Sequence, residues 1–81
     1  MITVHHRNRS IELPGEAARR LRANVWEVRV PDTEEVARRL RVRDLPAALD
    51  DAGVVLDGQE ADQVLVTGEA EGCVLVTVVL P

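Results

Sequence analysis

The chain has 81 residues, of which 46% are hydrophobic and 30% charged, and its formal net charge is −4 at pH 7. This length predicts one α+β domain over residues 1–81, and the longest apolar stretch, residues 73–80, is far too short for the ~20 residues of a membrane-spanning helix. Cys73 is the only cysteine, which excludes an internal disulfide, and no cationic stretch precedes an apolar one at the N-terminus, so we expect a cytoplasmic protein without a signal peptide.

The N-terminal segment predicts a β-hairpin, because apolar and polar residues alternate on both sides of a short polar turn. With residues 7–8 as a two-residue turn, Val4 faces Ile11 and Ile2 faces Leu13. The four apolar side chains then share one face, as a half-buried hairpin requires. The turn contains no glycine, so a three-residue loop is the alternative.

Two further elements are predicted before residue 32. Residues 16–23 favour a short helix with arginines on its outer face, and residues 25–30 alternate as a strand does. Trp26, Val28 and Val30 share one face of that strand. The tryptophan is the only aromatic residue, so we expect it in a core that otherwise consists of aliphatic side chains.

Two helices are predicted in the middle of the chain. The first begins after a cap at Asp32 or Thr33 and runs to about Leu40, with acids in its first turn and arginines in its last. The second begins after Asp44 and ends before Gly53, which suits a left-handed cap. Its apolar residues follow the spacing of one buried helix face: Leu45, Ala48, Leu49 and Ala52.

Two acids are unfavourably placed in this second helix. Asp50 and Asp51 lie at its C-terminal end, where the helix dipole disfavours negative charge by ~0.3–1 kcal/mol for each carboxylate. Solvation of both side chains is one explanation. An arginine partner from the first half of the chain is the other.

The C-terminal part predicts a short strand at residues 54–56 and a second hairpin. Residues 63–67 and 73–80 flank a five-residue loop, so that Val66 faces Val74. Both faces of the last strand are apolar, which is typical of a central strand or of an edge completed by a second copy. The residues of this candidate oligomer strand are Val74, Val76, Val78 and Leu80.

Candidate catalytic and metal-binding residues are few. His5 and His6 are adjacent on a strand and point to opposite faces, so they do not readily chelate one metal together. Cys73 begins an apolar strand, where cysteine behaves as a small hydrophobe, and a nucleophile would also need a base beside it. We therefore predict no catalytic, cofactor-binding or metal-binding residue, and no cofactor.

The charges are divided unequally along the chain. All ten basic residues are arginines within residues 1–43, which also hold six acids, whereas residues 44–81 hold eight acids and no base. The first part therefore carries +4 and the second −8, which predicts either a charged partner or pairing between the two parts. The arginines that could form one partner-binding or nucleic-acid-binding face are Arg19, Arg20, Arg22, Arg38, Arg39, Arg41 and Arg43. A basic set without lysine is typical of GC-rich bacterial genomes.

Residues 34–54 resemble the helix-turn-helix of small winged-helix repressors. The residues that match the first helix and turn of that family are Val36, Ala37, Leu40 and Val42. The resemblance implies DNA reading by the second helix. The chain departs from the family pattern because an arginine replaces the usual turn glycine, and because the second helix has acids and no base to face phosphates.

The predicted fold is α+β, with a small mixed or antiparallel sheet of about five strands and two or three short helices on one face. We predict a small non-catalytic binding or regulatory accessory protein that acts through protein–protein contacts as a homo-oligomer. Its partner would be another protein or a second copy, and no membrane is expected. The alternative is a nucleic-acid-associated regulator that uses the N-terminal arginines, and a third hypothesis is a small enzyme.

Overall fold

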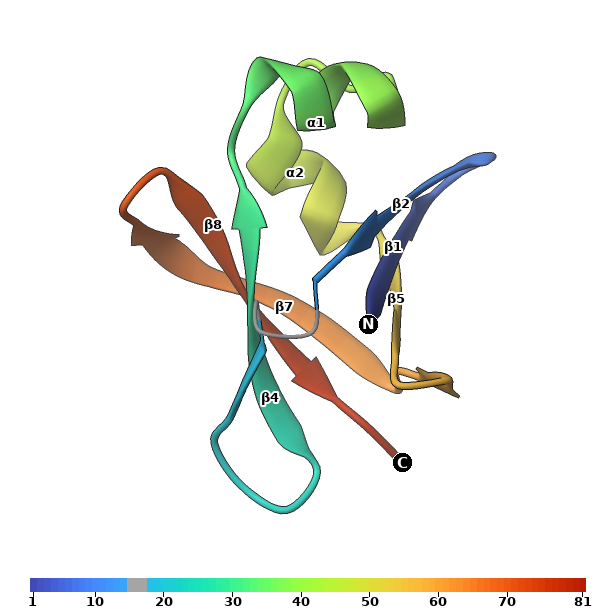
Figure 1. The fold of residues 1–81 in the computed structure, drawn as a ribbon, viewed down its shortest axis with the longest axis vertical. Coiled ribbons are helices and arrows are strands. Elements are labelled where there is room, and N and C mark those ends of the chain that lie inside the picture. The colour runs from blue at the N-terminus through green and yellow to red at the C-terminus, as the bar shows by residue number, and fades with distance from the viewer. Residues whose placement is uncertain (15–17) are drawn as a thin grey trace.

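The computed structural model describes residues 1–14 and 18–81, which form two antiparallel four-stranded sheets and two short helices (Figure 1). Strands make up 53% of the structure and helices 17%. The strands are β1 (Ile2–His6), β2 (Arg9–Leu13), β3 (Ala18–Arg20), β4 (Val25–Pro31), β5 (Gly53–Leu56), β6 (Gln59–Glu60), β7 (Gln63–Ala70) and β8 (Cys73–Val79). The helices are α1 (Glu34–Leu40) and α2 (Leu45–Asp50).

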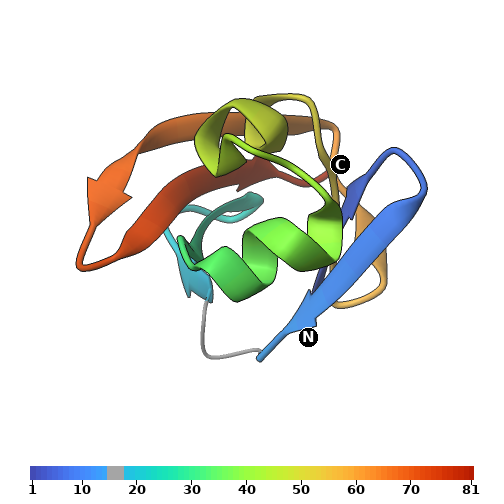
Figure 2. The same ribbon diagram turned by 90° about the horizontal axis from the view of Figure 1, so that it is seen from above.

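The predicted architecture is wrong, although the fold is loosely α+β. The strands form two sheets, with the orders β2-β1-β5-β6 and β3-β4-β8-β7, instead of one sheet of about five strands with helices on one face. Two sheets form because the buried face of each sheet packs on the same core, together with the two helices. In Figure 2, α2 lies against β7 and α1 lies toward the β1–β2 hairpin, so the helices are shared between the sheets.

The predicted N-terminal hairpin is confirmed. Val4 pairs with Ile11 and Ile2 with Leu13, and all four side chains are buried. The turn is the two-residue form, with Arg7 in a left-handed conformation (φ 56°). β5 then pairs with the other side of β1, which makes β1 an inner strand of its sheet.

The helix predicted for residues 16–23 is wrong over the part that the structure describes. Residues 15–17, which include its first two positions, lie outside the described residues, and residues 18–20 form β3. Ala18 pairs with Val28 and Arg20 with Trp26 across the β3–β4 turn. β3 exists because the edge of β4 offers backbone partners, and helix propensity over three residues is too weak to compete with them. Trp26 itself packs against the core but is only partly buried.

The second hairpin forms, but its predicted register is wrong by two residues. Val66 pairs with Val76 instead of Val74, and Ala70 pairs with Cys73. The connecting turn is only Glu71-Gly72, with both residues at positive φ (51° and 75°), so β7 extends through the predicted loop. A β-bulge between Val66 and Gly68 absorbs the extra residue.

Both predicted helices in the middle of the chain are confirmed. The Thr33 hydroxyl accepts a hydrogen bond from the Val36 amide (3.2 Å), and the Asp44 carboxylate accepts one from the Ala47 amide (3.3 Å). The predicted left-handed cap at Gly53 is wrong, because the C-cap of α2 is Asp51 (φ −111°) and Gly53 begins β5.

The core contains the residues of the candidate oligomer strand. Val74, Val76 and Val78 have no exposed surface, and Leu80 is 7% exposed. β8 lies between β4 and β7, so it is an inner strand of its sheet. These four side chains therefore pack within one copy of the chain, and contact with a second copy would have to use other residues.

Candidate functional site

The structure separates the arginines of the predicted binding face into two groups. Residues 19–22 lie on β3 and in the turn that follows it, whereas residues 38–43 lie on α1 and in the connection to α2. In Figure 1 the β3–β4 turn and α1 are at opposite ends of the long axis of the molecule. The two groups therefore form no single positive face.

Among the described residues, only two ion pairs join the basic first part of the chain to the acidic second part. Among the described residues, Arg29 is the only arginine with a carboxylate within 4.0 Å, that of Glu71 at 3.8 Å. Acids of the second half have other partners: the Asp57 carboxylate is 3.1 Å from the Met1 amino group, and the Asp50 carboxylate accepts a hydrogen bond from the Val66 amide (3.3 Å). The charge division is therefore a property of the molecular surface.

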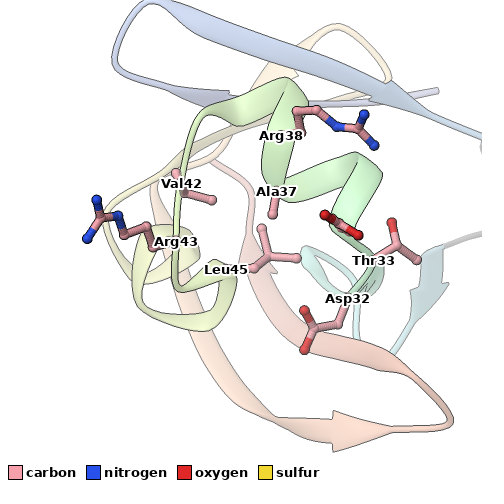
Figure 3. Close-up of a pocket in the computed structure, with 8 residues that line it drawn as sticks. Asp32, Thr33, Ala37, Arg38, Val42, Arg43 and Leu45 are labelled. Atoms are coloured by element: carbon pink, nitrogen blue, oxygen red, sulfur yellow. The ribbon is translucent and has the colours of Figure 1, made fainter.

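A cavity of about 410 Å³ lies between the two helices. It is lined by Asp32, Thr33, Glu34, Ala37, Arg38, Val42, Arg43 and Leu45. Figure 3 shows apolar side chains at its centre, whereas the Arg43 guanidinium points away from them. Two acids and two arginines around an apolar centre do not select a ligand of one charge.

A second cavity, of about 230 Å³, has a different lining. It lies between the tip of the β1–β2 hairpin and the C-terminal end of α1, which are at the same end of the molecule in Figure 1. The residues that line it are His6, Arg7, Asn8, Arg9, Leu40 and Arg41. Three arginines and a histidine without a carboxylate make this cavity strongly electropositive, and we call it the basic pocket.

Only one residue of the basic pocket, Arg41, belongs to the arginine face predicted from the sequence. A signal for His6 was present, since it continues the inward alternation of Ile2 and Val4, and it is 9% exposed in the structure. The sequence contains no comparable signal that the hairpin tip lies beside Arg41, because their proximity depends on the packing of α1 against β2.

The outer face of the second sheet is partly apolar. Val25, Leu75 and Val79 are partly buried, and Leu65 is 52% exposed. These side chains alternate with the fully buried residues of β4 and β8 and therefore point away from the core.

The other candidate residues do not converge. His5 is exposed and His6 buried, so they lie on opposite faces as expected, and Cys73 is on the other sheet. Across residues 1–14 and 18–81 no group of three or more histidine, cysteine, aspartate and glutamate side chains could hold a metal ion. The segment that resembles a helix-turn-helix does contain two helices, but α2 has six residues and its Leu45 and Leu49 are buried.

Within the described part of the chain, neither helix has the length and apolar character needed to cross a membrane. Comparisons with protein-family models, with curated proteins and with solved structures find no match for the chain.

Proposed function

We propose that the chain is a small non-catalytic binding protein with a regulatory or accessory role, and that it acts as a homo-oligomer through the outer face of the β3-β4-β8-β7 sheet. The observation that carries this proposal is the partly exposed apolar surface on that face. Leu65 on β7 lies in one row with Thr77 on β8 and Glu27 on β4, and Val25 and Val79 form the next row.

A sheet face of this composition suits protein contact. Side chains that stand on neighbouring strands form a continuous surface, and two such faces pack about 10 Å apart in a sandwich. An apolar centre with polar surroundings is the usual anatomy of a protein interface. Nucleic acid would need a positive face, and the arginine groups lie at opposite ends of the molecule.

The charges on this face favour a second copy as the partner. Arg19 and Glu27 are opposite each other on β3 and β4, and Arg29 is paired with Glu71. A face that contains equal numbers of both charges can be self-complementary in a twofold interface, because each arginine can meet the partner's carboxylate. A partner of one strong charge would gain less from it.

The size of the face sets the expected affinity. The four strands have three, seven, seven and eight residues. At ~3.3 Å per residue and a strand spacing of ~4.8 Å, they give roughly 400 Å² of sheet. A stable interface buries ~800 Å² on each partner. We therefore expect a weak dimer that dissociates in the micromolar range.

Sedimentation equilibrium across the micromolar range tests the proposal. The wild-type chain should pass from monomer to dimer, and Leu65→Glu should remain monomeric because it buries an unpaired charge in the interface. Gln59→Glu is the control, since Gln59 is exposed on β6, which belongs to the other sheet. A wild-type chain that is monomeric throughout, or a dimer that Leu65→Glu does not weaken, would overturn the proposal.

A further inference from the structure

We propose that the basic pocket is a binding site for the phosphate group of a small molecule. The pocket lies on the first sheet and α1, away from the proposed oligomer face, so the two proposals are independent. The pocket has three features that together point to a compact oxyanion: its charge, a buried histidine, and two arginines in an unfavourable backbone conformation.

The charge of the pocket is positive and not neutralised by the protein. Arg7, Arg9 and Arg41 line it, and no carboxylate of the described residues lies within 4.0 Å of any of them. Guanidinium groups present planar pairs of N–H donors that match phosphate oxygens, and they bind phosphate more specifically than a point charge does. A bound anion would reduce the repulsion between the positive charges of the three arginines that line this small cavity.

His6 adds a polar group to the inner wall of the pocket. The residue is only 9% exposed, yet its side chain has no hydrogen-bond partner among the described residues. No side-chain nitrogen of the described residues is both fully buried and without a partner, so the imidazole nitrogens of His6 must be accessible to solvent. They are therefore open to the pocket that the residue lines. A buried polar group without a partner in the protein is normally satisfied by water or by a ligand.

The backbone of the pocket is strained at two of its arginines. Arg7 and Arg41 have φ values of 56° and 55°, a left-handed conformation that costs ~1–2 kcal/mol for a residue with a side chain and almost nothing for glycine. Arg7 stands in a two-residue hairpin turn and Arg41 in a helix cap, where asparagine or glycine is usual. Both residues in this unfavourable conformation line the same cavity, which is expected if the arginines serve a ligand.

The size of the pocket favours a small molecule over a nucleic acid. A volume of about 230 Å³ holds a phosphate group with a small substituent. The arginines at residues 19–22 are at the other end of the molecule, so a duplex could not engage both groups along one face.

Calorimetric titration at ~150 mM salt tests the site. Inorganic phosphate, glycerol phosphate and acetate are the three probes. Phosphate or glycerol phosphate should bind with one saturable site, and acetate at least about tenfold more weakly. Tighter binding of glycerol phosphate would identify a phosphomonoester as the ligand, whereas equal binding would identify free phosphate.

Charge-matched variants locate the site. Arg7→Gln with Arg41→Gln should weaken phosphate binding by about 10–100-fold. Arg20→Gln with Arg22→Gln removes the same charge at the other end of the molecule and should leave binding unchanged. All four positions are exposed, so thermal unfolding should show that both variants fold. Equal losses in the two variants, or no saturable binding, would overturn the proposal. So would a DNA duplex that binds more tightly than either phosphate probe and loses affinity in the Arg7/Arg41 variant.

Discussion

The Asp50 carboxylate at the end of α2 accepts a hydrogen bond from the Val66 backbone amide on β7, with 3.3 Å between Oδ1 and N. β7 is an edge of its sheet, so this amide has no strand to bond on its open side. This hydrogen bond explains why Asp50 occupies the unfavourable C-terminal end of a helix. The carboxylate is stabilised by a backbone amide, and not by solvation alone or by an arginine. α2 and the adjacent bulge together make the middle of this edge a poor template for another strand.

Asp50→Ala should therefore destabilise the fold by about 1 kcal/mol, since a charged acceptor is lost while the helix end becomes less unfavourable. The urea denaturation midpoint measures the change, and the Val66 amide should exchange faster with solvent. Asp51→Ala removes the neighbouring exposed carboxylate and should be neutral or slightly stabilising. Equal midpoints for the two variants would show that the hydrogen bond contributes nothing.

Two glycines should respond differently to the same substitution. Gly72→Ala should cost about 1 kcal/mol, because Gly72 has φ 75° in the β7–β8 turn although its surroundings are open. Gly53→Ala should be neutral or stabilising by up to ~1 kcal/mol, because the added methyl group would meet only His5 Cβ at 3.9 Å. Thermal unfolding of both variants checks the difference, and a larger loss at Gly53 would contradict the described end of α2.

Arg41→Gly should make the protein more stable, by about 0.5–1 kcal/mol, because glycine adopts the left-handed cap conformation without steric cost. Arg39→Gly is the control: it lies within α1 and should cost about 1 kcal/mol. Chemical denaturation measures both. If the basic pocket binds phosphate, Arg41→Gly should gain stability and lose affinity at once, whereas a loss of stability would mean that the arginine side chain supports the fold.

Two valines on β8 test the two faces of that strand. Val76→Ala should destabilise the fold by about 2 kcal/mol or more, because two buried methyl groups are removed and a cavity remains. Val79→Ala should cost clearly less in a dilute monomer, since Val79 is partly exposed on the outer face. Denaturation midpoints in dilute solution check this order, and a reversal would mean that the faces are assigned the wrong way round.

The first hairpin and the two helices could be predicted because their determinants are local. Val4 meets Ile11 across a turn of two residues, and period-two alternation on both sides leaves only one register that buries both. Thr33 and Asp44 cap their helices because the side-chain oxygen of each accepts a hydrogen bond from the backbone amide three residues later. In each case the partner is within reach along the chain.

The elements that could not be predicted depend on distant partners or on a single inserted residue. Residues 18–20 become a strand because β4 is beside them. The bulge near Gly68 shifts the second hairpin, and the sequence contains no signal that separates a five-residue loop from a longer hairpin with a bulge. The basic pocket could not be predicted for the same reason: Arg7 and Arg41 become neighbours only when α1 packs on β2.

The pairing of β4 with β8 has a kinetic consequence. Residues 25–31 find their partners at residues 73–79, and residues 2–5 find theirs at residues 53–56, so each sheet closes only after a long intervening segment is ordered. Closing such loops costs chain entropy before any contact compensates for it, which places β-rich proteins of this kind among the slower small folders, at milliseconds to seconds. The hairpins β1–β2 and β7–β8, which close over short turns, are the parts able to form first, and joining them through β5 and β4 would then be the slow step.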